Sequence, residues 1–238
     1  MSKEFYTLKN KKMKVAGMMR LAEIDQEKVG KELMKLSITR LADKVSYLYF
    51  LKIGNIDDDI IEYIQNLNKP YKITDSENDY MTGWAFKNNE SLHDLYKTID
   101  VQYDWVLYPD ADDLLPDNIL DILIDADEKN AETIRLYFIE CFGSENDIIE
   151  IRTGYPIGPH FKAVKHRFDI GFVGSDGFNE ACCDLKRHET EYCMRHLRYA
   201  TKEGVEKRKS MNYFQDYFLQ NHATIPYSPN EKVNYYTR

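Results

Sequence analysis

The sequence lacks any run of about 18 apolar residues, the length that a helix needs to cross the hydrocarbon core of a bilayer. Its first residues, MSKEFYTLKNKKMKV, also contain no apolar stretch of the kind that a secretory signal peptide requires. These two absences predict a soluble, cytoplasmic protein without a membrane span.

Cysteine is scarce, and its spacing fits neither a disulfide framework nor a zinc site. No CxxC pair occurs, and scattered thiols in a chain of 238 residues are typical of reduced, buried side chains. The histidines are also spaced too irregularly for a structural zinc site. The four cysteines are Cys141, Cys182, Cys183 and Cys193.

Three common catalytic and phosphate-binding signatures are missing. Neither GxGxxG nor GxxxxGK[ST] occurs, which argues against a dinucleotide-binding dehydrogenase and a P-loop NTPase. The GxSxG elbow of α/β-hydrolases is absent as well. Any phosphate group would therefore have to be held by other means.

Basic residues are fewer than acidic ones, and the formal net charge is −8. An acidic surface does not attract phosphate backbones over a distance, so generic binding to nucleic acids or membrane surfaces is disfavoured. A protein of this charge that binds an anionic ligand generally needs a cation at the site. This expectation directs attention to clusters of carboxylates.

The first half of the chain alternates strand and helix signals. Such a β-α-β-α order predicts an α/β fold with a largely parallel sheet and helices on both faces, in a single domain of residues 1–238. The ligand of such a sheet lies beyond the carboxyl ends of its strands. The predicted strands are Met13–Met19, Val45–Leu51, Tyr71–Thr74 and Asp104–Tyr108, and the predicted helices are Glu27–Leu41, one capped by Asn55, one from Ser91 and one led by Pro116.

The second half has a different character. Thr133–Phe138 and Glu191–Tyr199 have the composition or alternation of strands, and Asp147–Arg152 offers a further short one. Gly154–Glu180 is rich in glycine, proline and aromatic residues, which predicts loops and short strands around a site. Helical spacing of apolar residues predicts a last helix over Glu203–Leu219.

The segment with the clearest chemistry is Asp110-Ala111-Asp112-Asp113, hereafter the DADD loop, which follows the predicted strand Asp104–Tyr108. Carboxylates separated by one residue at a strand end can approach the same cation. Mg²⁺ or Mn²⁺ would accept such oxygens together with those of a phosphate. A calcium-binding EF-hand is excluded, because Leu115 stands where that loop requires glycine. The alternative is a solvated acidic loop that caps the next helix.

The stretch Tyr103–Asp113, with sequence YDWVLYPDADD, resembles the DW-hydrophobic-DADE signature of GT-A fold glycosyltransferases, family 2 in particular. The lead-in Gly83–Lys87 fits the same plan, whereas Asp113 replaces the more usual glutamate. The resemblance implies a GT-A (nucleotide-diphospho-sugar transferase) fold with a C-terminal extension. It implies a nucleotide-sugar-binding half at 1–125, an acceptor-side half at 126–238, and inverting transfer of a hexosyl group from a nucleotide-diphosphate sugar, with a UDP-sugar favoured.

The resemblance also implies roles for individual residues. Asp110 and Asp112 would bind Mn²⁺ or Mg²⁺, and His196 would be a further metal ligand, with His160, His166 and His188 as rivals for that role. The donor-binding residues would be Arg20, Asp57, Asp75, Lys87 and Arg198. Arg20 and Asp57 would flank the nucleoside, and Asp75 would hydrogen-bond a uracil edge. Arg198 would engage the diphosphate or the acceptor.

An inverting transfer also needs a base within hydrogen-bonding reach of the acceptor hydroxyl. Asp176 and Glu180, in the acidic, glycine-flanked segment Gly174–Glu180, are the candidate catalytic residues, with Glu180 slightly favoured. The alternative is a turn that the Asp and Asn side chains stabilise.

Two other functions stay open at this point, a sugar nucleotidyltransferase and a non-catalytic nucleotide- or glycan-binding domain. The acceptor is not indicated, and a glycan, a protein, a lipid-linked sugar or a modified DNA base all remain. The composition, rich in Lys, Asn and Tyr, suits the AT-rich genome of a bacterium or a phage, and a phage would favour a modified base in DNA. The oligomeric state is equally open.

Overall fold

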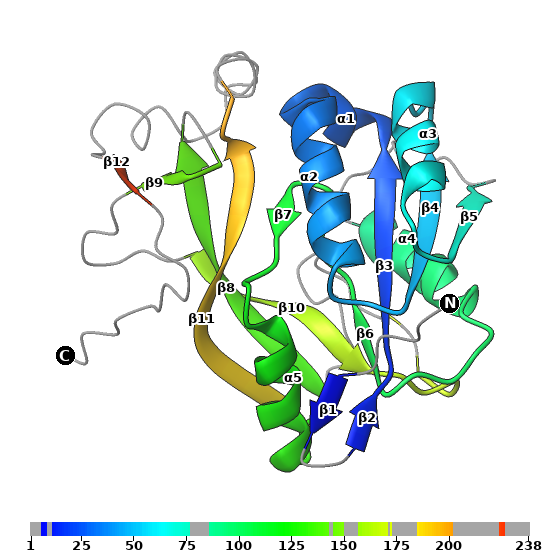
Figure 1. Ribbon diagram of the computed structural model, residues 1–238, viewed down its shortest axis with the longest axis vertical. Helices are drawn as coiled ribbons and strands as arrows, with labels where there is room; N and C mark the ends of the chain where they lie inside the picture. The colour runs from blue at the N-terminus through cyan, green and yellow to red at the C-terminus, as the bar shows by residue number, and fades with distance from the viewer. Residues whose placement is uncertain are drawn as a thin grey trace.

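The structure is a computed structural model that describes residues 6–8, 11–76, 86–142, 145–149, 157–170, 172, 185–201 and 224–226 (Figure 1). One long sheet runs through it, with the strand order β12-β9-β8-β10-β6-β3-β4-β5 and with β11 beside β8 and β7. A separate hairpin is formed by β1 (Tyr6–Leu8) and β2 (Lys11–Met13).

The N-terminal part of the sheet is parallel. Its strands are β3 (Val15–Ala22), β4 (Tyr47–Ile53), β5 (Tyr71–Asp75) and β6 (Trp105–Leu107). β3 lies between β4 and β6, and β5 lies outside β4, so the carboxyl ends of all four strands share one edge. Their connections contain α1 (Glu23–Val29), α2 (Lys31–Ala42), α3 (Asp58–Asn66) and α4 (Phe86–Lys97).

The second half continues the same sheet with antiparallel and parallel pairs. Beside β6 lies the antiparallel strand β10 (Ile157–Lys165), and beside β10 lies β8 (Thr133–Phe142). β11 (Arg187–Tyr199) pairs in parallel with β8 and antiparallel with the two-residue strand β7 (Asp113–Leu114). The remaining elements are α5 (Ile119–Glu128), β9 (Asp147–Ile149) and β12 (Thr224–Pro226). The α/β class with helices flanking a central sheet is therefore confirmed.

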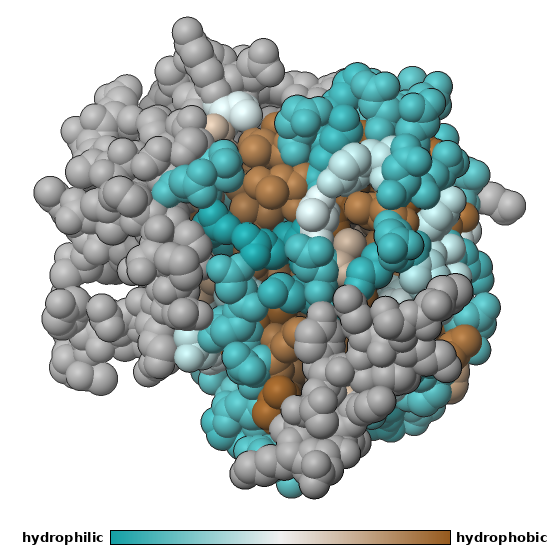
Figure 2. Space-filling view, in the orientation of Figure 1, coloured by the Kyte–Doolittle hydropathy of each residue, from teal (hydrophilic) through white to brown (hydrophobic). Residues whose placement is uncertain are grey.

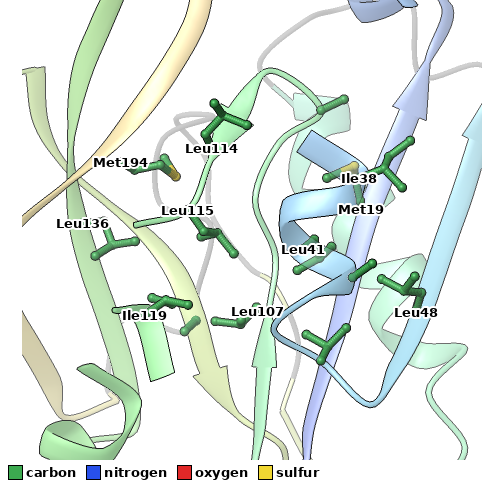
Figure 3. Close-up of a cluster of buried hydrophobic side chains, with 14 of the residues drawn as sticks. Met19, Ile38, Leu41, Leu48, Leu107, Leu114, Leu115, Ile119, Leu136 and Met194 are labelled. Atoms are coloured by element: carbon green, nitrogen blue, oxygen red, sulfur yellow. The ribbon is translucent and has the colours of Figure 1, made fainter. Parts of the chain in front are cut away.

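Helices cover both faces of the parallel strands, as the alternation of buried residues in β3 requires. Met19 and Leu21 point into a core with α2, α3 and α5, whereas Ala16 and Met18 pack with α4 on the opposite face. Figure 1 shows α1, α2 and α3 in front of β3 and β4, with α4 behind them. The first core extends without a break from Leu48 on β4 to the β8 and β11 side of the sheet (Figure 3).

Close packing of α2 on β3 depends on a glycine. A Cβ atom at Gly17 would lie 2.9 Å from Cγ and Cδ1 of Leu41 on α2, which is shorter than real side chains tolerate. Gly17 is therefore explained by packing between helix and strand.

The structure corrects three details of the predicted elements. The helix predicted over Glu27–Leu41 is two helices, separated at Gly30, whose φ of 83° favours glycine. Asp57, not Asn55, caps α3, because its carboxylate accepts a hydrogen bond from the backbone N–H of Asp59 at 3.3 Å. Ser91 lies inside α4 and does not begin it.

Part of the segment Gly154–Glu180, predicted to form loops and short strands, is the nine-residue strand β10. The helix predicted over Glu203–Leu219 lies outside the described residues. Within the described part, no helix is both long and apolar enough to cross a membrane. On the face of Figure 1, hydrophilic atoms cover α3, and hydrophobic atoms show between α1 and the upper end of β11 (Figure 2).

Candidate functional site

The DADD loop begins directly beyond the carboxyl end of β6, at the edge where the other parallel strands also end. The strand that precedes it is completely buried, which fixes where the loop starts. The loop closes on itself through two hydrogen bonds between Asp110 and Asp113. The N–H of Asp110 donates to Oδ2 of Asp113 at 2.8 Å, and the N–H of Asp113 donates to the carbonyl of Asp110 at 3.0 Å.

Strand β11 holds the other side of the loop. In the antiparallel pair of β7 with β11, His196 lies opposite Asp113, and the N–H of Leu197 donates to the carbonyl of Asp112 at 2.7 Å. This register brings Nε2 of His196 to 3.0 Å from Oδ2 of Asp112. The structure therefore brings these two side chains together, and their role as metal ligands stays a prediction.

Asp112, Asp113 and His196 form a compact group of potential metal ligands. One ligand atom from each residue lies within 4.8 Å of those of the other two, and all three side chains are buried. Oδ1 of Asp113 has no hydrogen-bond partner among the described residues, although the residue is only 1% exposed. A buried carboxylate oxygen without a partner is costly, and a bound cation would remove that cost.

Asp110 is engaged differently from Asp112. Its carboxylate forms ion pairs with Arg20, through Nη2, and with Lys162, whose Nζ lies 2.6 Å from Oδ2. Burial alone would raise the pKa of Asp110, but the two cations lower it well below its usual range. Asp110 is therefore a firmly ionised partner of basic groups, and its predicted role as a metal ligand stays a prediction.

Lys162 connects Asp110 with Asp113. Its Nζ lies 3.0 Å from Oδ2 of Asp113, and the lysine side chain is 1% exposed. Burial raises the pKa of Asp113 to about 6; Lys162 opposes this rise, and the charges of Asp110 and Asp112 add to it. The loop thus combines three carboxylates with a buried ammonium group.

Arg20 lies near the carboxyl end of β3, on the face covered by α4. Besides Asp110, its guanidinium contacts Oγ of Ser91 on α4 at 3.4 Å. Sequence reasoning placed Arg20 beside the nucleoside. The structure brings it to the DADD loop, which is where a cation could reach a bound phosphate.

An aromatic stack supports His196 from the side opposite Asp112. The ring of Phe138 on β8 stacks against His196 with centroids 5.1 Å apart, and it also stacks against His160 at 4.3 Å. Nζ of Lys162 lies 5.4 Å from the centroid of the same ring. Burial lowers the pKa of His160 to about 4, with help from the positive charge of Lys162. His160 is therefore neutral at physiological pH.

The other predicted site residues lie away from this cluster or outside the described part. Asp57 caps α3 and forms an ion pair with Lys31 at 2.5 Å. The side chain of Asp75, at the end of β5, is 83% exposed and lies 3.8 Å from Lys52. Their donor-binding roles stay predictions.

Four further predicted residues cannot be placed at the level of side chains. Lys87 lies in α4 and Arg198 in β11, but their side chains are outside the described part of the structure. Asp176 and Glu180, the candidate bases, lie outside the described residues altogether.

Sequence reasoning missed Lys162 and Phe138, and it considered His160 only as a rival of His196 for the ligand role. Lys162 and His160 lie on β10, in the segment whose glycines and prolines predicted loops and short strands. A usable signal was present, because Lys162 stands between Phe161 and Ala163-Val164, and a lysine inside an apolar run is often buried with a carboxylate partner.

Comparisons with known proteins give only distant similarity. No family model matches the chain, and no curated protein matches it. Among solved structures, S. aureus TarS 1-349 in complex with UDP-GlcNAc is similar over 61% of this chain and 37% of that one, with 16% identity and a TM-score of 0.38. This chain thus spans little more than a third of that protein fragment.

Two further solved structures are similar over a larger share of their length. The match with the inositol-1-phosphate CTP transferase from T. maritima covers 84% of this chain and 96% of that protein, with 10% identity and a TM-score of 0.46. The 4-diphosphocytidyl-2C-methyl-D-erythritol synthase from Anaerococcus prevotii covers 64% and 70%, with 11% identity and a TM-score of 0.39. At such TM-scores the function has to be inferred from the geometry of the site.

Proposed function

We propose that this chain is a metal-dependent glycosyltransferase that moves a sugar from a nucleotide-diphosphate sugar to an acceptor hydroxyl with inversion. The observation that carries the proposal is the convergence of Asp112, Asp113 and His196 at the carboxyl edge of a parallel sheet. The buried Oδ1 of Asp113, which has no hydrogen-bond partner among the described residues, fits a cation at this place.

The donor set suits Mn²⁺ or Mg²⁺, because it offers two carboxylates and one imidazole and leaves room for phosphate oxygens. A divalent cation here would neutralise the diphosphate and make it a better leaving group. His196 and the backbone hydrogen bond from Leu197 to Asp112 would keep the carboxylate of Asp112 directed at the ion.

The chain also supplies positive charge of its own at the loop. Arg20 and Lys162 both reach Asp110, so a diphosphate beside the loop would meet two cationic side chains. The resemblance of YDWVLYPDADD to the family 2 signature favours a UDP-sugar and adds Lys87, Arg198, Asp57 and Asp75 as donor-binding candidates. Asp176 or Glu180 would take the proton of the acceptor hydroxyl.

A sugar nucleotidyltransferase is the second candidate, and the pairing of two basic side chains with an acidic loop favours it equally. Such an enzyme would hold a nucleoside triphosphate with the same ion and the same cations. The two reactions differ in their products, because a glycosyltransferase releases a nucleoside diphosphate and a nucleotidyltransferase releases pyrophosphate.

The first test is thermal unfolding with a panel of nucleotide-sugars and nucleoside triphosphates, each with and without Mn²⁺. A ligand at 100 times its Kd should stabilise the protein by about 2.7 kcal/mol, or roughly 2–4 °C for a chain of this size. We expect a shift from one nucleotide-sugar that requires Mn²⁺ and is lost in Asp112→Asn. Asp121→Asn, on the exposed side of α5, is the matched control and should retain the shift.

The outcome separates the candidates. A shift with a nucleotide-sugar, followed by release of nucleoside diphosphate in the presence of an acceptor, supports the glycosyltransferase. A shift with a triphosphate, followed by release of pyrophosphate with a sugar phosphate, supports the nucleotidyltransferase. If no nucleotide shifts the transition under any metal condition, the DADD loop is a structural cap and the proposal is wrong.

A further inference from the structure

Lys162 is among the most deeply buried side chains of the protein, although it carries a charge. It lies within β10, and its Nζ contacts Oδ2 of Asp110 at 2.6 Å and Oδ2 of Asp113 at 3.0 Å. The carbonyl of Lys162 also accepts a hydrogen bond from the N–H of Tyr108, at the start of the turn into the DADD loop. Backbone and side chain thus fix this lysine to the loop.

Burying an ammonium group is costly unless carboxylates compensate it fully. A lysine at this place therefore needs a reason beyond packing, since an apolar residue would fill the same space at less cost. The reason lies in the charge of the loop. Three carboxylates within four residues repel one another strongly, and the ammonium group lies between two of them.

The two oxygens of Asp113 have different surroundings. Oδ2 lies 3.0 Å from Nζ of Lys162 and accepts a hydrogen bond from the N–H of Asp110, whereas Oδ1 has no hydrogen-bond partner in the described part of the structure. Oδ2 of Asp113 therefore faces the ammonium group of Lys162, and Oδ1 is available to a cation bound by the cluster of Asp113, Asp112 and His196. The position between Asp110 and Asp113 is filled, and the position among Asp112, Asp113 and His196 is compatible with an ion.

Loops with several carboxylates can hold two divalent ions about 3.5–4 Å apart, with a carboxylate shared between them. Asp113 would be the shared carboxylate here, and Asp110 would complete the second site. An ammonium group at 2.6 and 3.0 Å from these two residues takes the place of that second ion and would repel it.

We propose that Lys162 is a positioning residue that serves as a tethered second cation, so that the DADD loop binds a single divalent ion at Asp112, Asp113 and His196. This inference rests on the proposed metal site. It adds that the number of ions is set by a residue of β10 outside the loop, and that removing its charge opens a second ion site between Asp110 and Asp113.

The test is the stoichiometry of Mn²⁺ binding to the full chain without nucleotide, measured by EPR of free Mn²⁺ and by isothermal titration calorimetry. We expect one ion per chain in the wild type, two in Lys162→Met, and one again in Lys162→Arg, which restores the positive charge. A purely structural lysine would change thermal stability in Lys162→Met but leave the number of ions at one.

Each outcome has a separate meaning. Two ions in the wild type, or one ion in a folded Lys162→Met protein, overturns the inference while the proposed metal-dependent function stands. No ion in the wild type overturns the metal site itself and the inference with it. If Lys162→Met does not fold, as judged by near-UV circular dichroism, Lys162→Gln takes its place, since glutamine is neutral but still donates a hydrogen bond. Two ions are expected there as well, and one ion overturns the inference.

Discussion

Nε2 of His196 lies 3.0 Å from Oδ2 of Asp112, although 84 residues separate the two in the sequence. The protein contains a second pair of the same kind, because Nε2 of His188 lies 3.0 Å from Oδ2 of Asp125 on α5. The first pair is buried beside Asp113, whereas the aspartate of the second is half exposed. Because the two histidine–aspartate contacts have the same length, a substitution of His188 is a control for the same substitution of His196.

Replacing His196 by glutamine should weaken Mn²⁺ binding, because the imidazole both offers a ligand atom and orients Asp112. We expect the Kd for Mn²⁺ to rise on the order of 10–100-fold, measured by EPR of free Mn²⁺. His188→Gln removes the same kind of contact elsewhere and should leave the Kd unchanged. Equal effects of the two substitutions would show that His196 is not a ligand.

Replacing Phe138 by leucine should affect both stability and metal binding. The ring separates His160 from His196, and its loss should reduce the free energy of unfolding by about 1–2 kcal/mol. Because the imidazole of His196 would lose its flat support, the Kd for Mn²⁺ should also rise, by about tenfold.

The control is Phe161→Leu on β10, the strand that pairs with β8. The ring of Phe161 is equally buried, but it lies against the guanidinium groups of Arg135 and Arg187, at 5.0 and 5.5 Å. This substitution should cost a similar free energy of unfolding without changing the Kd. A parallel loss of affinity in both variants would argue against a specific role of the Phe138 stack.

Replacing Gly17 by alanine should destabilise the protein by about 1–3 kcal/mol, because the new methyl group would overlap Leu41. Chemical denaturation of four proteins checks this prediction: wild type, Gly17→Ala, Leu41→Ala and the double variant. In the Leu41→Ala background the added methyl group has space, so its cost should nearly vanish. An equal cost in both backgrounds would mean that the close approach of α2 to β3 is not the cause.

The free energy of unfolding should decrease as the pH is lowered, because His160 titrates differently in the folded and unfolded states. Its pKa is lowered to about 4 in the folded state, against about 6.5 in the unfolded chain. Above pH 6.5 the imidazole is neutral in both states, so it does not affect the free energy of unfolding. As the pH falls towards 4, the unfolded chain takes up a proton that the folded protein does not, and the free energy of unfolding decreases by at most about 3 kcal/mol. Partial exposure of the side chain reduces this figure.

His160→Phe, which keeps a ring against Phe138 but cannot titrate, should therefore lose less free energy of unfolding than the wild type between pH 6.5 and 4. Urea denaturation at several pH values measures the difference. Parallel curves for the two proteins would show that His160 does not titrate abnormally in the folded state.

Much of the parallel half of the fold could be predicted from the sequence. The strands ending at Tyr108 and near Leu51 are continuous apolar runs, and burial on both faces of a parallel sheet requires such runs. The DADD loop was predicted at a strand end for the same reason. The pairing of Asp112 with His196 followed from a family resemblance, since no local pattern links residues 84 positions apart.

The basic half of the site could not be predicted in the same way. Arg20 was expected at the end of the first strand and lies near the carboxyl end of β3, but its partner Asp110 is fixed only when β3 and β6 become neighbours. Lys162 lies on a strand that contains Gly158 and Pro159 near its start, residues that are typical of loops. Its role depends on pairing of β10 with β6, a contact between residues more than 50 positions apart that sequence periodicity does not encode.

The pairing of β7 with β11 also has a consequence for how the protein folds. His196 reaches the DADD loop only through a strand that lies between β7 and β8, and the loop itself is synthesised long before that strand. Contacts of such large separation close late and slowly. A nascent chain that ends before β11 carries the three carboxylates without their histidine. If the proposed site binds Mn²⁺, binding with the affinity of the full chain would therefore require that β11 has already paired with β7, and EPR of free Mn²⁺ would report this step of folding.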